Sequence, residues 1–237
     1  MEKKSQKIKR SECHNKDEFH FAVINLERSI DRMEHYPEIY HRHVAFDGVN
    51  ETPCFSGGLG IQKLVTRYNT RDVKRKCMYG CIRSHMALLW KIYANRLHNV
   101  VVMEDDNDLI DDDIIAKLNN TECDGITYLG GWIVPPLMKD IKQDMSAIKE
   151  SFKEGLNTID YDNFRILTTR CYYVPTPEDA KDMFFYLLNR KKWKALDIMF
   201  AESKIPKYFW YPAVGLQRLE CESQIMNKKI TTRMENY

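Results

Sequence analysis

Short apolar runs separated by polar segments recur along this chain, and they predict strands that alternate with helices. The predicted strands are Phe19–Asn25, Val44–Phe46, Val100–Met103, Ile126–Leu129, Ile166–Val174 and Tyr208–Tyr211. Strands separated by helical segments are typical of α/β proteins, in which the sheet is largely parallel. We therefore expect an α/β fold with a mostly parallel central sheet.

The clearest helical pattern lies between Cys81 and Leu97, where apolar residues recur at spacings of three and four. Weaker patterns predict short helices near Ser29 and Ile114, helices at Glu178–Asn189 and Trp193–Phe200, and a C-terminal helix near Glu222. The stretch from Val49 to Cys77 and the stretch that follows Leu129 up to about Phe164 lack a regular pattern. We expect both to be connections or irregular structure.

Three acidic residues, Glu104, Asp105 and Asp106, follow directly after the apolar run Val100–Met103. Successive residues of a strand point to opposite sides, so Glu104 and Asp106 are expected on one side, with Asp105 facing away. A pair of carboxylates supplies the hard oxygen ligands that Mg²⁺ and Mn²⁺ prefer. The alternative is a solvated acidic loop that leads into the next helix, because more aspartates follow at 108 and 111–113.

Two further polar residues, Asn25 and Asp47, also lie at the ends of predicted strands. Ligands of parallel sheets bind beyond the carboxyl ends of the strands. The three strand ends are therefore expected to meet at one binding site.

Length and composition indicate a single folded domain. The chain has 237 residues, of which 43% are hydrophobic, enough for one substantial core. Residues 1–18 are polar and charged and are expected to form a flexible tail, so the domain is placed at 19–237. The net charge is only +2, which provides no general electrostatic attraction for nucleic acid.

The same composition bears on the cellular compartment. The sequence has no apolar run long enough to span a membrane and no apolar core of a signal peptide, and its seven cysteines are an odd number. We therefore expect a cytoplasmic protein with reduced thiols. Basic residues cluster at 3–10, 71–76 and 190–194. These clusters are interpreted as solvated segments, with peripheral contact to an anionic membrane surface as the alternative.

Four segments, in their order and spacing, resemble glycosyltransferase family 25, the lipooligosaccharide and procollagen galactosyltransferase group. Members of that family carry V-I-N-L-x-R-S-x-D-R, A-x-D-G, G-C-x-x-S-H and L-E-D-D. In this chain the corresponding segments are Val23–Arg32, Ala45–Gly48, Gly80–His85 and Met103–Asp106. The resemblance extends through Tyr128–Gly131 and Arg170–Val174, and so covers most of residues 19–226.

The resemblance implies a GT-A type nucleotide-sugar fold and an inverting, metal-dependent hexosyltransferase. The donor would be a UDP-sugar, with galactose or glucose as the transferred hexose, and the cofactor would be Mn²⁺ or Mg²⁺. The acceptor would be a hydroxyl of a glycan, a lipid-linked sugar or a protein. Some large DNA viruses encode short relatives of this kind, which is compatible with a viral source.

The resemblance also implies roles for individual residues. Glu104 and Asp106 would hold the metal, and Asp197 would be the base that deprotonates the acceptor hydroxyl. The expected donor-binding residues are Asn25, Arg28, Asp47, Ser84, His85, Asp105, Gly130 and Gly131. All histidines precede Asn99, so the metal is expected to complete its shell with carboxylates, phosphates and water.

Structural roles remain open for several of these residues. Arg28 could brace the first helix, His85 could be a hydrogen-bonded core residue, and Asp197 could be a helix-start acid. Gly130 and Gly131 could form a plain turn.

Two departures from the family pattern bear on activity. Met78 stands where family members usually have a glutamate, and Gln224 stands where they tend to have an aspartate. An amide cannot serve as a base or an anionic ligand at neutral pH. A degenerate relative that binds a nucleotide sugar or glycan without turnover is therefore the main alternative, and a metal-dependent phosphoryl-transfer enzyme or nuclease is the third.

Overall fold

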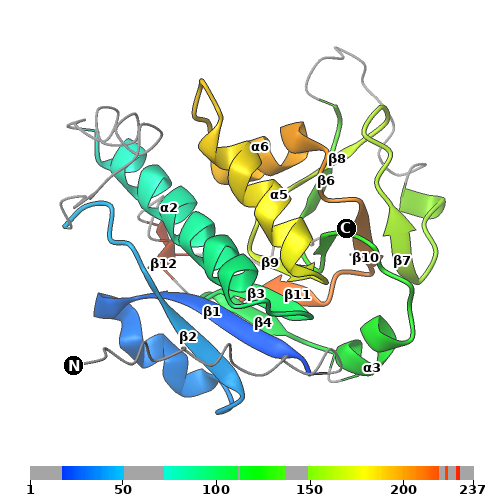
Figure 1. The fold of residues 1–237 in the computed structure, drawn as a ribbon, viewed down its shortest axis with the longest axis horizontal. Coiled ribbons are helices and arrows are strands. Elements are labelled where there is room, and N and C mark those ends of the chain that lie inside the picture. Colours follow the sequence, from blue (N-terminus) through cyan, green and yellow to red (C-terminus); the bar gives the residue numbers. More distant parts are fainter. Residues whose placement is uncertain are drawn as a thin grey trace, which may run out of the picture.

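A seven-stranded sheet forms the centre of the computed structural model, which describes residues 18–50, 72–111, 113–136, 149–218, 222–223 and 228–229 (Figure 1). The strands follow the order β2-β1-β3-β9-β5-β10-β7. Their bounds are Tyr40–Ala45 for β2, His20–Leu26 for β1, Val100–Glu104 for β3, Cys171–Val174 for β9, Thr127–Tyr128 for β5, Tyr208–Tyr211 for β10 and Gly155–Thr158 for β7.

The sheet is mostly parallel, as the sequence predicts. β1 pairs in parallel with both β2 and β3, and β10 pairs in parallel with β5. β9 is antiparallel to both β3 and β5, which places these two strands in the same direction, and β7 is antiparallel to β10. Five of the seven strands therefore run one way, and their carboxyl ends share one edge of the sheet.

Helices cover both faces of the sheet. Figure 1 shows α2 (Val73–Ala94) and α5 (Pro177–Leu188) lying across one face, with α6 (Leu196–Ser203) beside them. α3 (Ile114–Asn119) contributes to the core on the opposite face, and a 3₁₀ helix, η1 (Glu27–His35), connects β1 to β2. Within the described residues, no helix has the length and apolar character needed to cross a membrane.

Alternation along the central strand builds the two cores. Val100 and Val102 of β3 join the cluster beneath α2, α5 and α6, whereas Val101 and Met103 join the cluster that includes α3. All four side chains are at most 1% exposed. A strand buried on both faces reads as a continuous apolar run, which is why the sequence predicts its position correctly.

The helix predicted from Cys81 begins eight residues earlier, at Val73. Asp72 caps it, because its side chain accepts a hydrogen bond of 3.0 Å from the amide of Lys74. The first turns carry the exposed Lys74 and Arg75 and the partly buried Lys76, which give no apolar periodicity. The predicted connection from Val49 is therefore shorter than expected; residues 51–71 lie outside the described part of the chain.

The single strand predicted for Ile166–Val174 is wrong, because this segment forms two strands of different sheets. β8 (Arg165–Leu167) pairs with β6 (Trp132–Val134), whereas β9 belongs to the central sheet. Thr168 has a φ of +77°, in the left-handed region, and breaks the extended backbone between them.

Other short strands also differ from the prediction. β6 and β7 lie in the segment expected to be irregular, and β4 (Asn107–Leu109) pairs with β11 (Gly215–Gln217). The helix expected near Glu222 is not formed there; β12 (Glu222–Ser223) pairs instead with β13 (Lys228–Lys229). Such short strands are defined by their partners, because two or three residues are too few to show a period.

A partly buried histidine on β2 makes stability depend on pH. Burial and the nearby charge of Lys91 lower the pKa of His43 to about 4. The unfolded chain has an ordinary histidine pKa of about 6.5, so at intermediate pH it binds more protons than the folded chain. The stabilising effect of neutral His43 is therefore complete above about pH 6.5 and is lost as the pH falls towards 4.

We expect the free energy of unfolding to fall by about 1 kcal/mol between pH 7 and pH 5 through His43, after allowance for solvent screening. Thermal unfolding across this range would show a shallower pH dependence in His43→Gln than in the wild type. His41→Gln, at an exposed position of the same strand, is the matched control and should keep the wild-type slope. Identical slopes for all three proteins would contradict the prediction.

Candidate active site

A cavity of about 130 Å³ lies at the carboxyl ends of β1, β2 and β3. Its lining comes from four segments: residues 24–32, 45–48, 77–85 and 104–106. The first, second and fourth segments follow the three parallel strands, and the third belongs to α2. The predicted meeting of strand ends is therefore formed, and α2 closes one side of it.

The acidic triplet spans the end of β3 and the turn that follows it. Glu104 is the last residue of β3, and Asp105 and Asp106 form a turn into β4. The turn is held by the Asp105 amide, which donates to the carbonyl of Ile24 at 3.1 Å. All three acidic residues line the cavity, but their carboxylates have different partners: that of Glu104 contacts α2, whereas that of Asp105 contacts Asn25 and Arg32, so Asp105 is directed away from Glu104 as expected.

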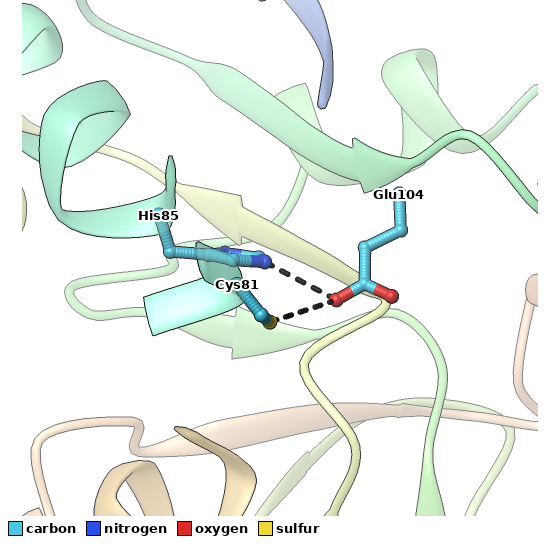
Figure 2. Close-up of side chains that lie close together, drawn as sticks. All are labelled: Cys81, His85 and Glu104. Carbon is cyan, nitrogen blue, oxygen red and sulfur yellow. Dashed lines mark hydrogen bonds and ion pairs between the residues drawn. The ribbon is translucent and has the colours of Figure 1, made fainter. Parts of the chain in front are cut away.

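Glu104 is held by two side chains of α2 (Figure 2). Its Oε1 lies 3.2 Å from His85 Nε2 and 3.8 Å from Cys81 Sγ, so both contacts converge on one oxygen. The other ring nitrogen of His85, Nδ1, lies 3.0 Å from the hydroxyl of Tyr172 on β9. Figure 2 shows the two α2 side chains pointing together at the tip of β3.

Electrostatics differ sharply within this group. Burial favours the neutral form of Glu104, but the hydrogen bond and charge of His85, with the charge of Arg170, outweigh it and lower the pKa of the carboxyl. Burial, reinforced by the charge of Glu104, raises the pKa of the Cys81 thiol well above its usual value. Glu104 is therefore an anion at neutral pH, and Cys81 is a neutral thiol.

Asp106 is oriented by two amides. Gln217 Nε2 donates to Asp106 Oδ2 at 2.8 Å, and Asn107 Nδ2 donates to Oδ1 at 3.0 Å. Pairing of β11 with β4 brings Gln217 to this position. Burial and the neighbouring charge of Glu104 raise the pKa of Asp106 to about 6.

Asp105 is bound by a cation and an amide. Arg32 Nη1 donates to Asp105 Oδ1 at 2.9 Å, and Asn25 Nδ2 donates to Oδ2 at 2.8 Å. Asn25 is fully buried, and its side chain also contacts the carbonyl of Ser29 and Arg42 Nε. These contacts give Asn25 a bracing position behind the strand tips, and it does not belong to the described lining of the cavity.

Arg28 and Asp47 form an ion pair at the cavity and both belong to its lining. Burial favours neutral Asp47, but hydrogen bonds from Asn50 and from the amide of Val49 prevail and lower its pKa. Ser84 links the segment that contains Asp47 to α2, because its hydroxyl accepts from the amide of Phe46 at 2.8 Å.

Two glycines let this segment lie directly against α2. A Cβ atom on Gly80 would lie 2.8 Å from the backbone nitrogen of Gly48. The close backbone contact explains a glycine in the Gly-Cys pair and in the Asp-Gly pair of the motifs.

Gly130 and Gly131 serve packing instead of lining the cavity. A Cβ atom on Gly130 would lie 2.1 Å from the carbonyl oxygen of Gly215, and Gly131 has a φ of +151° with Ile166 directly beside it. Among the described residues that line the cavity, neither glycine is found. Both glycines are thus required by close packing against residues of β8 and β11, and their contact with the donor stays a prediction.

Asp197 occupies the first turn of α6. Its carboxylate accepts from the amides of Ile198, at 2.8 Å, and Thr168. Burial raises its pKa, and the charge of Glu104 adds to the effect, which places Asp197 within electrostatic range of the strand tip. It is a helix-start acid as the structural alternative states, yet it lies close enough to sense the candidate site.

Sequence reasoning missed several residues that hold the site together. Arg170 is 6% exposed, donates to Gln217 Oε1, and lies over the ring of Trp132 at 5.3 Å. Arg218 donates to the carbonyl of Asp105. No local pattern points to Gln217 or Arg218. Arg170, in contrast, is the first residue of the segment Arg170–Val174, so the sequence could have indicated it.

Cys81 is also absent from the site residues that the sequence predicts, although it lies in the segment Gly80–His85. Its position one helical turn before His85 places both side chains on the same face of α2.

Comparison with known proteins finds no family model that matches this chain and no matching curated protein.

Proposed function

We propose that this chain is an inverting glycosyltransferase with a GT-A type fold, which transfers galactose or glucose from a UDP-sugar to a hydroxyl group. One observation carries the proposal. Every residue that lines the cavity, apart from Cys77, comes from one of the four segments that resemble glycosyltransferase family 25. Segments up to about 80 positions apart thus converge on a single site, which supports a shared binding function for them.

The size and chemistry of the cavity suit the diphosphate region of the donor. Its volume of about 130 Å³ is below the range of about 300–1,000 Å³ that is typical of pockets enclosing a whole ligand. The cavity would therefore enclose part of the donor. Arg28 and Arg32 reach it from the segment after β1 and supply positive charge beside the carboxylates.

The residues Glu104 and Asp106 both line this cavity, and carboxylate oxygens are the ligands that divalent cations of the Mg²⁺ or Mn²⁺ type prefer. A bound cation of this kind would neutralise charge on the departing diphosphate. The residues around it act as supports: His85 orients Glu104, Tyr172 orients His85, and Gln217 orients Asp106.

Asp197 is the proposed base. An inverting displacement requires one base, placed opposite the leaving group, to take the proton of the acceptor hydroxyl. The raised pKa of Asp197 makes its carboxylate a stronger proton acceptor than an ordinary aspartate. The amides of Ile198 and Thr168 fix its orientation.

The degenerate relative remains a second candidate because of Met78. This side chain packs against the hydrophobic core from α2, so the glutamate expected there from the family has no carboxylate counterpart. Gln224 lies outside the described residues. An assay of UDP-sugar hydrolysis separates the two functions, because a binding protein would be stabilised by the donor without releasing UDP.

We expect UDP to bind much more tightly with Mn²⁺ than with EDTA, and we expect Asp106→Asn to weaken the metal-dependent binding by about tenfold or more. An amide keeps the hydrogen bond from Gln217 but lacks the charge that attracts the ion. Isothermal titration calorimetry, with UDP titrated into the purified protein, measures the metal dependence of UDP affinity and its change in Asp106→Asn. Asp113→Asn, at an exposed acid outside the cavity, is the control and should bind like the wild type. Equal UDP affinity in EDTA and in Mn²⁺ would contradict the proposal that UDP binding requires a divalent metal.

A further inference from the structure

Three potential metal ligands of different chemistry meet at the tip of β3. Cys81 Sγ, His85 Nε2 and a carboxylate oxygen of Glu104 all lie within 4.8 Å of one another. Figure 2 shows them converging from α2 and β3 onto a common point. Within the described residues, this is the group of three or more potential ligands whose ligand atoms are close enough to share one ion.

Two of the three ligand–ligand distances are close to the edges of a tetrahedral coordination sphere. Metal–ligand bonds of about 2.3 Å to sulfur and about 2.0–2.1 Å to nitrogen and oxygen give edges of about 3.3 Å for N···O and about 3.6 Å for S···O. The observed values are 3.2 Å from His85 Nε2 to Glu104 Oε1 and 3.8 Å from Cys81 Sγ to the same oxygen. An ion could therefore enter with only small side-chain movements.

The surroundings hold the ligands in place. Cys81 and His85 are four residues apart on α2 and share one helix face. The His85 ring stacks on Tyr172, with centroids 5.8 Å apart, and its Nδ1 lies 3.0 Å from the Tyr172 hydroxyl. A partner on the second nitrogen is the usual way in which a protein orients a metal-binding histidine.

The group borders the cavity. The His85 side chain is 1% exposed, whereas that of Glu104 is 29% exposed, and all three residues line the cavity. A fourth coordination position would thus face the cavity, as in sites where a metal binds an exogenous ligand.

We propose that Cys81, His85 and Glu104 form a three-ligand site for a divalent transition metal ion of the Zn²⁺ or Co²⁺ class. Sulfur and imidazole ligands select such ions over Mg²⁺ and Ca²⁺, which prefer oxygen alone. The site shares Glu104 with the all-oxygen pair Glu104 and Asp106 but differs from it in the metal it selects. When the ion binds, the Cys81 thiol releases its proton to solvent and the thiolate bonds to the metal.

Any use of this ion in sugar transfer rests on the proposed function, whereas its binding does not. The experiment is therefore a titration of the full-length, metal-free protein with Co²⁺, followed by absorption spectroscopy. A thiolate bound to Co²⁺ produces a charge-transfer band in the near ultraviolet, which oxygen and nitrogen ligands alone do not produce. We expect this band in the wild type, and its loss in Cys81→Ser.

A matched control is available on the same helix. Cys77 also lines the cavity but does not belong to the three-ligand group, so Cys77→Ser should keep the band. Tyr172→Phe should keep the band but weaken Co²⁺ affinity by about 10-fold or more, because it removes the partner of His85 Nδ1. Circular dichroism on each variant verifies that the fold is retained.

A second measurement covers the case in which Cys81→Ser does not fold. In the wild type, Zn²⁺ should slow alkylation of Cys81, and Mg²⁺ at the same concentration should not; peptide mass spectrometry reports each cysteine separately. Absence of both the Co²⁺ band and Zn²⁺ protection would overturn the proposal and leave a hydrogen-bonded cluster. Sugar transfer that depends on Mn²⁺ without a Co²⁺ band would overturn the site and keep the proposed function. A Co²⁺ band without any donor turnover would support the metal site and overturn the proposed function.

Discussion

Under the proposed function, replacement of Glu104 by glutamine is expected to lower the rate of sugar transfer by about 10²–10³-fold, because it removes a charge from the place where the diphosphate would depart. The amide oxygen can still accept the hydrogen bond from His85, so the local geometry is retained. The melting temperature should therefore change little while the rate collapses. Steady-state transfer rates and thermal unfolding on the same preparation test this separation of effects.

Asp105→Asn is the natural comparison for Glu104→Gln, because the two acids are adjacent but have different partners. Asp105 forms an ion pair with Arg32 in which both side chains are no more than 15% exposed. Loss of one partner from such a buried pair costs about 3 kcal/mol or more. We therefore expect Asp105→Asn to lower the stability clearly. If Glu104→Gln behaved in the same way, with parallel losses of stability and rate, a purely structural role for Glu104 would follow.

Replacement of Asp197 by asparagine is expected to lower turnover by about 10²-fold or more and to leave donor affinity nearly unchanged. General base catalysis typically contributes 10²–10⁴-fold, and an amide cannot accept the proton. Asparagine can still accept hydrogen bonds from the amides of Ile198 and Thr168, so the start of α6 should remain intact. Donor affinity, melting temperature and transfer rate need to be measured on one preparation of the variant.

Asp179 provides a matched control for Asp197. It also lies in the first turn of a helix, and burial raises the pKa of its carboxyl as well. However, α5 follows β9, which is antiparallel to β3, so Asp179 lies at the opposite edge of the sheet from Glu104. Asp179→Asn should therefore leave the rate unchanged. Full activity in Asp197→Asn would exclude it as the base and direct attention to Glu220 and Glu222, whose side chains lie outside the described structure.

Glu104 lies at the tip of a central strand and would act on the leaving group, whereas Asp197 lies at the start of a helix and would act on the acceptor. A rate loss in Glu104→Gln alone would support donor cleavage with a different base. A rate loss in both variants, with donor affinity retained in Asp197→Asn, would support the full mechanism.

The sequence predicts the central elements well where burial is continuous. The run Val100–Met103 is apolar on every residue because both faces of β3 are covered. The part of α2 that begins at Cys81 is predicted from its apolar residues, which recur at spacings of three and four. Its polar first turns are missed, because residues that face solvent leave no periodic signal.

Irregular backbone and short pairings escape the local pattern. The segment from Ile166 to Val174 has β-forming residues on both sides of Thr168, Thr169 and Arg170, and nothing in this local pattern indicates that Thr168 turns the chain from one sheet into another. Likewise, the pairing of β4 with β11 joins residues more than 100 positions apart, and each strand alone is too short to be recognised.

At the candidate site, the sequence alone determines which chemical groups are available and that an acidic cluster stands at a strand end. Local order decides this, because a strand stops where its apolar run stops. Only the tertiary structure decides which groups meet. It brings Cys81 and His85 to Glu104. It also pairs Asp105 with Arg32 and packs Gly130 against Gly215. These contacts arise from the packing of α2 on the sheet and from the insertion of β9 beside β3. Such long-range contacts depend on the whole core, and no short segment encodes them.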